Sequence, residues 1–452
     1  MKIIIVGSGA VGSSICHQLA KENHAITVID TNVEALTRIT NSLDITGIHG
    51  NGATVSVLKE AGADSADLLI AVTNEDELNI LCCFAARKLG TTNTIARVRN
   101  PEYAGLMVLM QEDLNLSLTI NPEYAVAKEV DRILKFPGAT RLSSLCDGAV
   151  ELAELTIRPG SDLIGKSLLR LRIELGVKFI VCAVMRDNKV YIPTGDFVLN
   201  EGDKVAVTAN EVELTKFFKA SGNYIRPIRE LIVHGGGRVT YYLCELLKKR
   251  KTNLVAIEKN RELCQSLAES FPEITVINGD GTNQDLLIEE GIKDADAFLA
   301  LSSVDEENAS VSMFAKTQKV PKIVTMISSL PYIDFFRAVG IESIISPKSS
   351  TVDYILRFIR SLAASEVSEI EALYRIMDGK IEALEFKVIE KIDGITDIPL
   401  RNLKKRSNCI ICCIAREGNI IFPSGDDMIQ RNDTVIVINK GKQMTSIKDI
   451  KG

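Results

Sequence analysis

Histidine is scarce in this chain of 452 residues, and tryptophan is absent. The four histidines are His17, His24, His49 and His234. None of them falls in the two segments predicted below to form small domains, where a dehydrogenase would keep the acid–base group next to its substrate. The residue spacings of a Ser-His-Asp triad, an H-E-x-x-H helix or paired C-x-x-C motifs are also missing. We therefore predict no catalytic residue and no metal site.

Long apolar runs and an excess of basic residues are missing as well. No stretch approaches the ~18–20 apolar residues of a membrane span. The apolar residues 1–6 lead straight into a glycine turn, so they predict a buried strand rather than a signal peptide. The formal net charge of -6 gives no basic surface for nucleic acid. Ten cysteines without tight disulfide spacing suit a reducing compartment, and we expect a cytoplasmic protein.

The chain carries an internal duplication. Gly7 and Asp30 delimit a strand, turn, helix and strand in the first half, and Gly235 and Glu258 delimit the same pattern in the second. Residues 71–77 return as residues 300–306, and residues 193–196 return as residues 423–426. Because these matches keep a nearly constant spacing, they indicate a duplication and not a coincidence.

Each half begins with short apolar runs that alternate with segments of helical periodicity. In the first half the predicted strands are residues 2–6, 25–30, 45–49, 67–73 and 93–99. Strands that alternate with helices predict a parallel sheet with right-handed crossovers. From about residue 149 to 218, shorter strands separated by Gly, Asp and Pro turns predict a small α+β domain.

The predicted fold class is therefore α/β, with two tandem Rossmann-like parallel-sheet domains, each followed by a small α+β domain. The predicted domains are residues 1–135, 136–222, 228–365 and 366–452. The first and third of them are the Rossmann-like domains.

A complete G-x-G-x-x-G motif follows the first predicted strand and precedes the first helix. Its residues are Gly7, Ser8, Gly9, Ala10, Val11 and Gly12. The first glycine allows a tight turn, the second lets a pyrophosphate approach the backbone, and the third lets the helix pack closely on the strand. The helix N-terminus offers free N–H groups to the phosphates. This context predicts a nucleotide site; the alternative is a Rossmann-like sheet that binds nothing.

Further site residues are predicted where the next strands end. Asp30 ends the second strand, where its carboxylate would accept hydrogen bonds from adenosine ribose hydroxyls and repel a 2′-phosphate. NAD or an adenine nucleotide is therefore favoured over NADP. Asn51 follows the third strand, near the position of an adenine edge. Thr73 and Asn74 follow the fourth strand, at the crevice where open α/β sheets bind ligands.

Arg97 and Arg99 lie two residues apart in the fifth predicted strand, which places them on one face. Guanidinium groups that face the crevice would suit additional phosphate charge. The alternative is a ladder of surface ion pairs, because one sequence does not show which face the two arginines occupy.

The second half is predicted to hold a related site without this pair of arginines. Its expected residues are Gly235, Gly236, Gly237, Arg238, Val239, Glu258, Asp280 and Ser302. Thr240 stands in place of the third glycine. Met326 and Ser328 stand in place of the two arginines. The alternative is a purely structural half with an empty or weak site.

These motifs resemble those of the TrkA family of tandem RCK proteins. The resemblance rests on the glycine motif and on residues 60–67, 71–77 and 95–103, and the duplicated layout extends it over nearly the whole chain. It implies two RCK nucleotide-binding domains, each followed by a TrkA C-terminal domain. The first-half glycines, Asp30, Thr73 and the two arginines match the family's nucleotide-binding positions, whereas Asn51 and Thr240 depart from them.

The resemblance also implies a function without enzymatic activity. It indicates a regulatory subunit that binds NAD(H), ATP or ADP and gates a TrkH-type membrane potassium channel. A homotetramer on the inner face of the cell membrane, peripheral to it, is implied as well. Two alternatives are an NAD-dependent oxidoreductase and an RCK regulator of a different membrane transporter.

Overall fold

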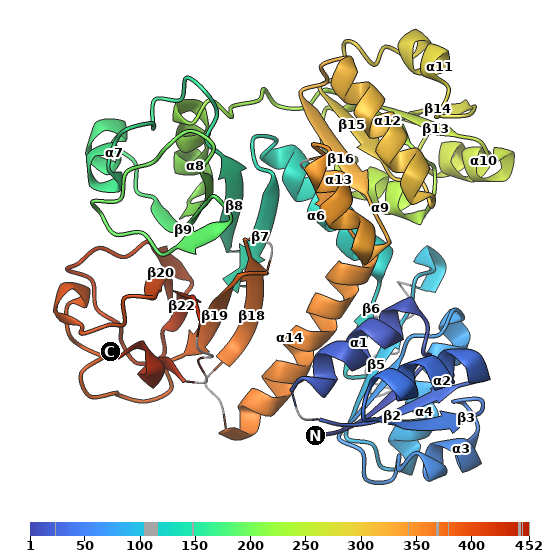
Figure 1. Ribbon diagram of the computed structural model, residues 1–452. Coiled ribbons are helices and arrows are strands. Elements are labelled where there is room, and N and C mark those ends of the chain that lie inside the picture. The colour runs from blue at the N-terminus through green and yellow to red at the C-terminus, as the bar shows by residue number, and fades with distance from the viewer. Residues whose placement is uncertain are drawn as a thin grey trace.

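The computed structural model describes most of the chain. The described residues are 1–22, 24–103, 116–146, 149–341, 343–367, 370–377, 379–441, 444 and 446–451. Within these ranges, six-stranded parallel sheets alternate along the chain with five-stranded antiparallel sheets (Figure 1). This confirms the predicted fold class of two Rossmann-like domains that are each followed by a small domain. The four domain boundaries stay a prediction.

The first parallel sheet is built by the N-terminal part of the chain. Its strands are β1 (Lys2–Val6), β2 (Ala25–Asp30), β3 (Thr46–His49), β4 (Leu68–Ala71), β5 (Asn93–Arg97) and β6 (Leu118–Ile120), in the order β3-β2-β1-β4-β5-β6. The helices are α1 (Ala10–Ala20), α2 (Val33–Ser42), α3 (Val55–Glu60), α4 (Asp76–Leu89) and α6 (Pro122–Lys135). All four residues of β4 are buried, because a parallel sheet is covered on both faces. The strand order reverses between β1 and β4, the point at which such sheets bind ligands.

The second parallel sheet has the same topology. Its strands are β12 (Glu230–His234), β13 (Asn253–Glu258), β14 (Thr275–Asn278), β15 (Ala297–Ala300), β16 (Lys322–Met326) and β17 (Ile344–Ile345), in the order β14-β13-β12-β15-β16-β17. The helices are α9 (Arg238–Leu247), α10 (Arg261–Ser270), α11 (Gln284–Glu289), α12 (Asp305–Thr317), α13 (Leu330–Ala338) and α14 (Pro347–Val367). The matching order is the structural counterpart of the duplication in the sequence.

Two antiparallel sheets form the small domains. The first small domain comprises β7 (Arg141–Leu145), β8 (Val150–Thr156), α7 (Leu168–Leu175), β9 (Ile180–Arg186), β10 (Lys189–Tyr191), β11 (Lys204–Ala209) and α8 (Glu211–Ala220). The second comprises β18 (Ile370–Ile376), β19 (Ile381–Lys387), η2 (Leu400–Asn402), β20 (Cys409–Arg416), β21 (Asn419–Ile421), β22 (Thr434–Asn439) and η3 (Ile447–Ile450). The two sheets share one apolar core, in which Leu152 and Cys182 of the first belong with Ile376 and Cys412 of the second.

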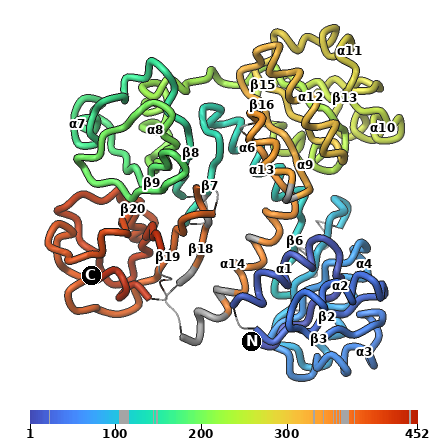
Figure 2. Tube along the Cα trace, in the orientation of Figure 1, coloured from blue at the N-terminus to red at the C-terminus, as the bar shows by residue number. Residues whose placement is uncertain are grey.

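One helix of each half packs against the Rossmann-like unit of the other half (Figures 1 and 2). The apolar stripe of α6, which includes Val130 and Ile133, joins the core of the second parallel sheet together with Leu243 of α9. Conversely, α14 of the second half packs on α1, where Ile355 and Ile15 share the core of the first sheet. The two Rossmann-like units are thereby interlocked within a single chain.

Candidate nucleotide sites

The glycine turn of the first half is shaped as the motif predicts. Gly7 has a φ of +103°, and a Cβ there would lie 3.1 Å from the backbone nitrogen of Thr73. A Cβ on Gly12 would lie 1.9 Å from the Gly7 oxygen, so only glycine lets α1 approach the turn this closely. Gly9, in contrast, would meet nothing within 4 Å. The fold itself does not require a glycine at this position, and the open space is where a pyrophosphate would pass.

The N-terminus of α1 is open to a ligand. Gly9 is the N-cap residue, and no side chain caps the helix there. By comparison, Asn32 caps α2 and Asn121 caps α6 with side-chain hydrogen bonds. Ala10 begins α1 and is exposed, whereas Ser8 and Val11 are buried. An uncapped helix N-terminus leaves N–H groups and the positive end of the helix dipole for phosphate oxygens.

Asp30 lies beside this turn at the end of β2. Its Oδ2 accepts hydrogen bonds from the backbone N–H of Ser8 at 2.5 Å and from Ser8 Oγ at 2.7 Å, while Oδ1 accepts from the Asn32 N–H at 2.8 Å. Burial is the largest single influence on the pKa of Asp30 and acts to raise it. The hydrogen bonds from Asn32 and Ser8 nevertheless bring the pKa below its ordinary value. Asp30 is therefore held as a carboxylate that can still accept ribose hydroxyls.

Asn79, which was not predicted, organises the end of β4. Its side chain is fully buried, its Oδ1 accepts from the N–H and the hydroxyl of Thr73 at 2.8 Å each, and its Nδ2 donates to the Arg97 carbonyl at 2.9 Å. The repeat holds a signal for it, because Asn308 makes the corresponding bonds to Ser302 N–H and the Met326 carbonyl, both at 2.9 Å. Such an amide fixes the strand ends that border the crevice.

The structure brings both arginines to the same strand end. Arg97 is buried and donates to the carbonyl of Thr73 and, at 3.3 Å, to Oδ1 of Asn74. Arg99 follows β5 and donates to the Asn74 carbonyl at 2.6 Å. Both guanidinium groups therefore lie at the end of β4 that borders the crevice. Arg99 also forms an ion pair with Asp76, with Nε 3.6 Å from Oδ1, and a role of the two arginines in phosphate binding stays a prediction. Asn51 is exposed after β3, where its Oδ1 accepts from the Ala53 N–H at 2.9 Å.

The second crevice repeats the first with changes. Oε2 of Glu258 accepts from the Gly236 N–H at 2.7 Å, and a Cβ on Gly237 would meet nothing within 4 Å. Gly237 is also the N-cap of α9 without a capping side chain. Thr240 replaces the third glycine, and its hydroxyl donates to the Gly235 carbonyl at 2.5 Å. The turn and the helix are therefore joined by a hydrogen bond here, and not by the close backbone contact of the first half.

The remaining predicted residues of the second half surround the same turn. Val239 is buried and Arg238 is exposed at the start of α9. Oδ1 of Asp280 accepts from the N–H of Thr282 at 2.9 Å and from its hydroxyl at 2.7 Å. These hydrogen bonds from Thr282 lower the pKa of Asp280. His234 occupies the space beside Gly281, because a Cβ on that glycine would lie 2.1 Å from the His234 ring.

The two crevices are joined where α6 begins. The Tyr242 hydroxyl of α9 donates to the Arg99 carbonyl at 3.0 Å and accepts from Asn121 Nδ2 at 2.7 Å. Next to it, Glu123 lies within the electrostatic reach of Arg97 and Arg99 of the first half and of Arg238 of the second. Burial raises the pKa of Glu123, and these three arginines act in the opposite direction. Charged groups of both halves therefore meet at this point.

Chemically, this arrangement can bind and orient a nucleotide. It offers an uncapped helix N-terminus for phosphates, a carboxylate for ribose, and two guanidinium groups for added phosphate charge. The glycine turns, Asp30 and Glu258 fit a nucleotide in each half. Within the described residues, no group of three side chains suited to holding a metal ion occurs.

Comparison with known proteins agrees with this geometry. The TrkA-N domain family matches residues 3–118 and 231–347, and the TrkA-C domain family matches residues 152–222. The "Trk system potassium uptake protein TrkA homolog" of Archaeoglobus fulgidus is 30% identical over 453 residues, which is 100% of both chains. The "Trk system potassium uptake protein TrkA" of Halomonas elongata is 32% identical and covers 100% of this chain and 98% of that one.

Solved structures show the same fold. The GsuK RCK domain superposes with a TM-score of 0.62 at 17% sequence identity and covers 97% of this chain and 92% of that one. A GsuK channel bound to NAD superposes with a TM-score of 0.63 at 18% identity, over 97% and 76% of the two chains. At this identity the likeness shows the fold alone. Because the TrkA-N matches span more than half of the chain and the relatives align from end to end, the chain belongs to the TrkA family of Trk potassium uptake proteins.

Proposed function

We propose that the chain is the nucleotide-sensing regulatory subunit of a Trk-type potassium uptake system and gates a TrkH-like membrane channel. Its family consists of components of potassium transport, and the chain is not an enzyme. The observation that carries the nucleotide part is the open space over Gly9 at an uncapped helix. No packing contact requires a glycine there, whereas the phosphates of NAD(H), ATP or ADP would.

The first crevice is the main sensor in this proposal. Phosphates would lie against the N–H groups at the start of α1, and the ribose hydroxyls would donate to Asp30. Arg97 and Arg99 would receive the terminal phosphate, because they are the cations at that strand end. Arg238 of the second half lies within electrostatic reach of Glu123, as Arg97 and Arg99 do. A triphosphate and a dinucleotide would therefore place different charge between the halves.

Such a difference can be transmitted because the halves are interlocked. Arg99 is bonded through its carbonyl to Tyr242, which belongs to the helix that begins at the second glycine turn. A ligand shifts a conformational equilibrium only by its differential affinity for two arrangements. Charge placed next to Arg99 would supply that difference at the junction of α6 and α9.

The partner and the location follow from the same proposal. No described helix combines the length and the apolar character needed to cross a bilayer. The chain would therefore act on potassium flux through a TrkH-type subunit, from the cytoplasmic side and peripheral to the membrane. We further propose a homotetramer, because regulatory rings close by symmetry and change shape at the interfaces between their modules.

Substituting the open glycines tests the nucleotide sites. In Gly9→Ala the added methyl group enters space that the protein leaves free, so the fold is retained while the phosphate path is blocked. We expect the affinity for ATP, measured by calorimetry on the full chain, to fall at least about tenfold, or about 1.4 kcal/mol. Gly237→Ala makes the same change in the second half and should alter the ATP affinity much less, because Met326 and Ser328 replace the arginines there.

The outcome distinguishes three possibilities. Loss of ATP binding only in Gly9→Ala supports a sensor in the first half. Equal loss in both variants would contradict the asymmetry between the halves. Unchanged binding of ATP and NAD in both variants would refute nucleotide binding at the glycine turns. Thermal unfolding of each variant checks that the domains remain folded.

A further inference from the structure

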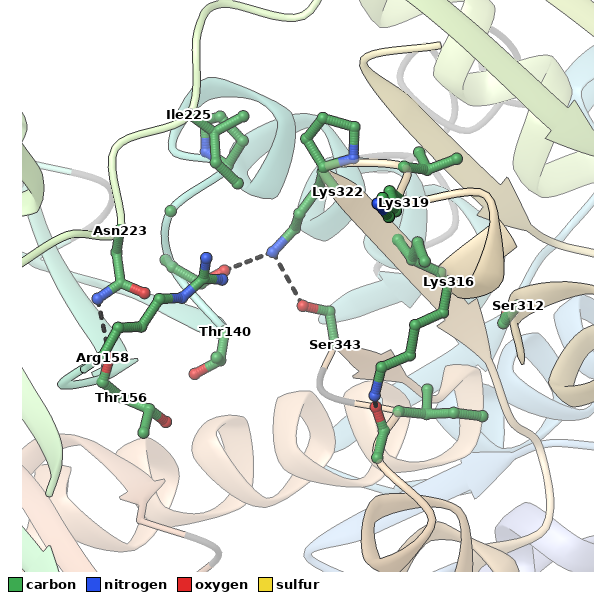
Figure 3. Close-up of a pocket in the computed structure, with 18 of the residues that line it drawn as sticks. Thr140, Thr156, Arg158, Asn223, Ile225, Ser312, Lys316, Lys319, Lys322 and Ser343 are labelled. Atoms are coloured by element: carbon green, nitrogen blue, oxygen red, sulfur yellow. Dashed lines mark hydrogen bonds between the residues drawn. The ribbon is translucent and has the colours of Figure 1, made fainter. Parts of the chain in front are cut away.

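A cavity of about 520 Å³ lies between the first small domain and the second parallel sheet (Figure 3). The small domain contributes Arg158, just after β8, and the second sheet contributes Lys322, the first residue of β16. The nucleotide crevice lies at the other end of β16, where Asn308 binds the carbonyl of Met326. The cavity is therefore separate from the crevice, and its volume lies within the range of small-molecule sites.

The described residues that line the cavity carry a net positive charge, opposite in sign to that of the whole chain. Among its described lining residues, Arg158, Lys316, Lys319 and Lys322 are positive, and Glu201 is negative. The chain as a whole has a net charge of -6. Cations from two different domains repel each other across a shared cavity unless an anion lies between them.

Lys322 anchors positive charge at the wall of this cavity. Only 5% of the residue is exposed. Its Nζ donates to Ser343 Oγ at 2.9 Å and to the carbonyl of Ala139, which belongs to the chain leading into the first small domain (Figure 3). An ammonium group is costly to bury. This one is held in place by partners on both sides of the boundary between the domains.

The other cations divide into one with a structural role and two without. Lys316 Nζ donates to the Gly340 carbonyl at 2.8 Å and so closes the turn after α13. Arg158 and Lys319 are exposed, and neither side chain has a hydrogen bond or ion pair with another described residue. In Figure 3, Arg158 points from the small domain toward the centre of the cavity.

The duplication provides an internal comparison for the lysines. At the turn where the first half has Gly90, with a φ of +130°, the second half has Lys319 with a φ of +61°. Left-handed backbone favours glycine, so a lysine there carries a conformational cost. Asn93, which begins β5, is likewise replaced by Lys322 at the start of β16. Both positive charges are thus particular to the half that borders this cavity.

We infer that the cavity is a binding site for a small polyanion of the phosphate-ester class, held between Arg158, Lys319 and Lys322. Guanidinium and ammonium groups on two domains are the chemistry that recognises clustered phosphate oxygens. A ligand bound there would tie the first small domain to the second sheet. Because α12 and β16 both run from this cavity to the crevice, the bound anion would also fix the elements that border the second nucleotide site.

Inorganic tripolyphosphate is a suitable probe, because it has no ribose or base. It would be titrated calorimetrically into the full chain at low ionic strength. The double variant Arg158→Gln/Lys319→Gln should bind at least about tenfold more weakly, since it lacks two of the cations that would bind phosphate oxygens. The control Lys249→Gln/Lys251→Gln removes the same charge from two exposed lysines outside the cavity and should bind like the unmodified protein.

Hydrogen exchange would locate the probe. Protection of residues 137–140 and 319–323 by tripolyphosphate supports the site. Protection confined to the glycine turns would place the probe in the nucleotide crevices and overturn the proposal. It would also be overturned if the two double variants bind equally, or if the unmodified protein shows no saturable binding. None of these outcomes depends on whether NAD or ATP binds the crevices.

Discussion

At the scale of single residues, Asp30 is the side chain that most directly tests the nucleotide assignment. Asp30→Ala removes the ribose acceptor together with the bonds from Ser8 and Asn32. We expect NAD and adenine nucleotide affinity to fall by ~1–3 kcal/mol, the scale of one charge-assisted hydrogen bond. Calorimetric titration measures this, with Asp44→Ala, which removes an exposed carboxylate in the turn before β3, as the control. Unchanged affinity in Asp30→Ala would contradict the ribose assignment.

His234 gives the second half a titratable imidazole at the position where the first half has Val6. Burial lowers the pKa of His234, and the nearby Glu307, Asp280 and Glu258 do not overcome it. As pH falls below about 6.5, the unfolded chain takes up this proton before the folded protein does. Stability conferred by the neutral ring is therefore present above that pH and lost as pH falls through the lower pKa of the folded state.

The variant His234→Val restores the residue that the first half has at Val6. It should make the decline in unfolding midpoint between pH 7.5 and 5.5 shallower than in the unmodified protein. Urea unfolding of the variant and of the unmodified protein, each at pH 7.5 and at pH 5.5, measures how far the midpoint of each protein declines. Parallel pH profiles would show that His234 does not titrate on unfolding. The absolute stability of the variant is a separate matter, because the smaller side chain leaves space beside Gly281.

The roles of some single residues could be predicted from the sequence, and those of others could not. The roles of Gly7 and Gly12 follow from a motif in which each glycine has a distinct steric reason, and the structure has those contacts. Asn79 was missed because a buried asparagine inside a helix carries no motif of its own. Only its recurrence as Asn308 gives a signal, and that signal becomes meaningful once both amides are seen to hold a strand end.

At the scale of elements, the contact between α6 and α9 is the junction of the two halves. Tyr242→Phe deletes the hydroxyl that bonds to both Asn121 and the Arg99 carbonyl, and it leaves these two groups only their direct hydrogen bond of 3.4 Å in a partly buried place. We expect a decrease of about 1–2 kcal/mol in the free energy of unfolding. Tyr241→Phe is the matched control, because Tyr241 packs edge-on against Tyr242 and Phe271 through its ring. Equal destabilisation by both variants would argue against the hydroxyl bridge.

Five of the six strands of the first parallel sheet were predicted, because short apolar runs alternate with helical periodicity, and the observed bounds of β1 and β2 equal the predicted ones. The short edge strand β6 was not predicted. The exchange of α6 and α14 could not be predicted in the same way. The apolar stripe of α6 shows that one face must be buried, but it does not show which sheet buries it. That choice depends on contacts between residues more than a hundred positions apart, such as Asn121 with Tyr242.

At the scale of the whole molecule, the interlocked halves act as one unit. Because α6 completes the core of the second sheet and α14 completes that of the first, neither half contains its own full core. Separately expressed halves would expose these apolar faces, so binding differences between the crevices are better measured with single-site variants of the full chain. Because of this interlocking, a ligand in the first crevice would lie close to the start of α6, the helix that packs on the second sheet.

Arg97→Gln/Arg99→Gln tests whether the crevice regulates transport. The change removes two cations next to Asn74 while the strand end remains held by Asn79. ATP carries more phosphate charge than ADP, so the loss of the arginines should weaken ATP binding more than ADP binding. The difference between the two binding free energies should shrink by roughly 1–3 kcal/mol for each guanidinium group removed. In a strain lacking the native gene, the variant should still assemble and reach the membrane partner, yet potassium uptake should respond less to nucleotide. Light scattering measures the assembly, and a monomer at micromolar concentration would contradict the closed oligomer. If potassium uptake by the variant responds to nucleotide as strongly as uptake by the unmodified protein, the arginines do not convert binding into gating. The charge difference between the nucleotides would then be sensed elsewhere between the interlocked sheets.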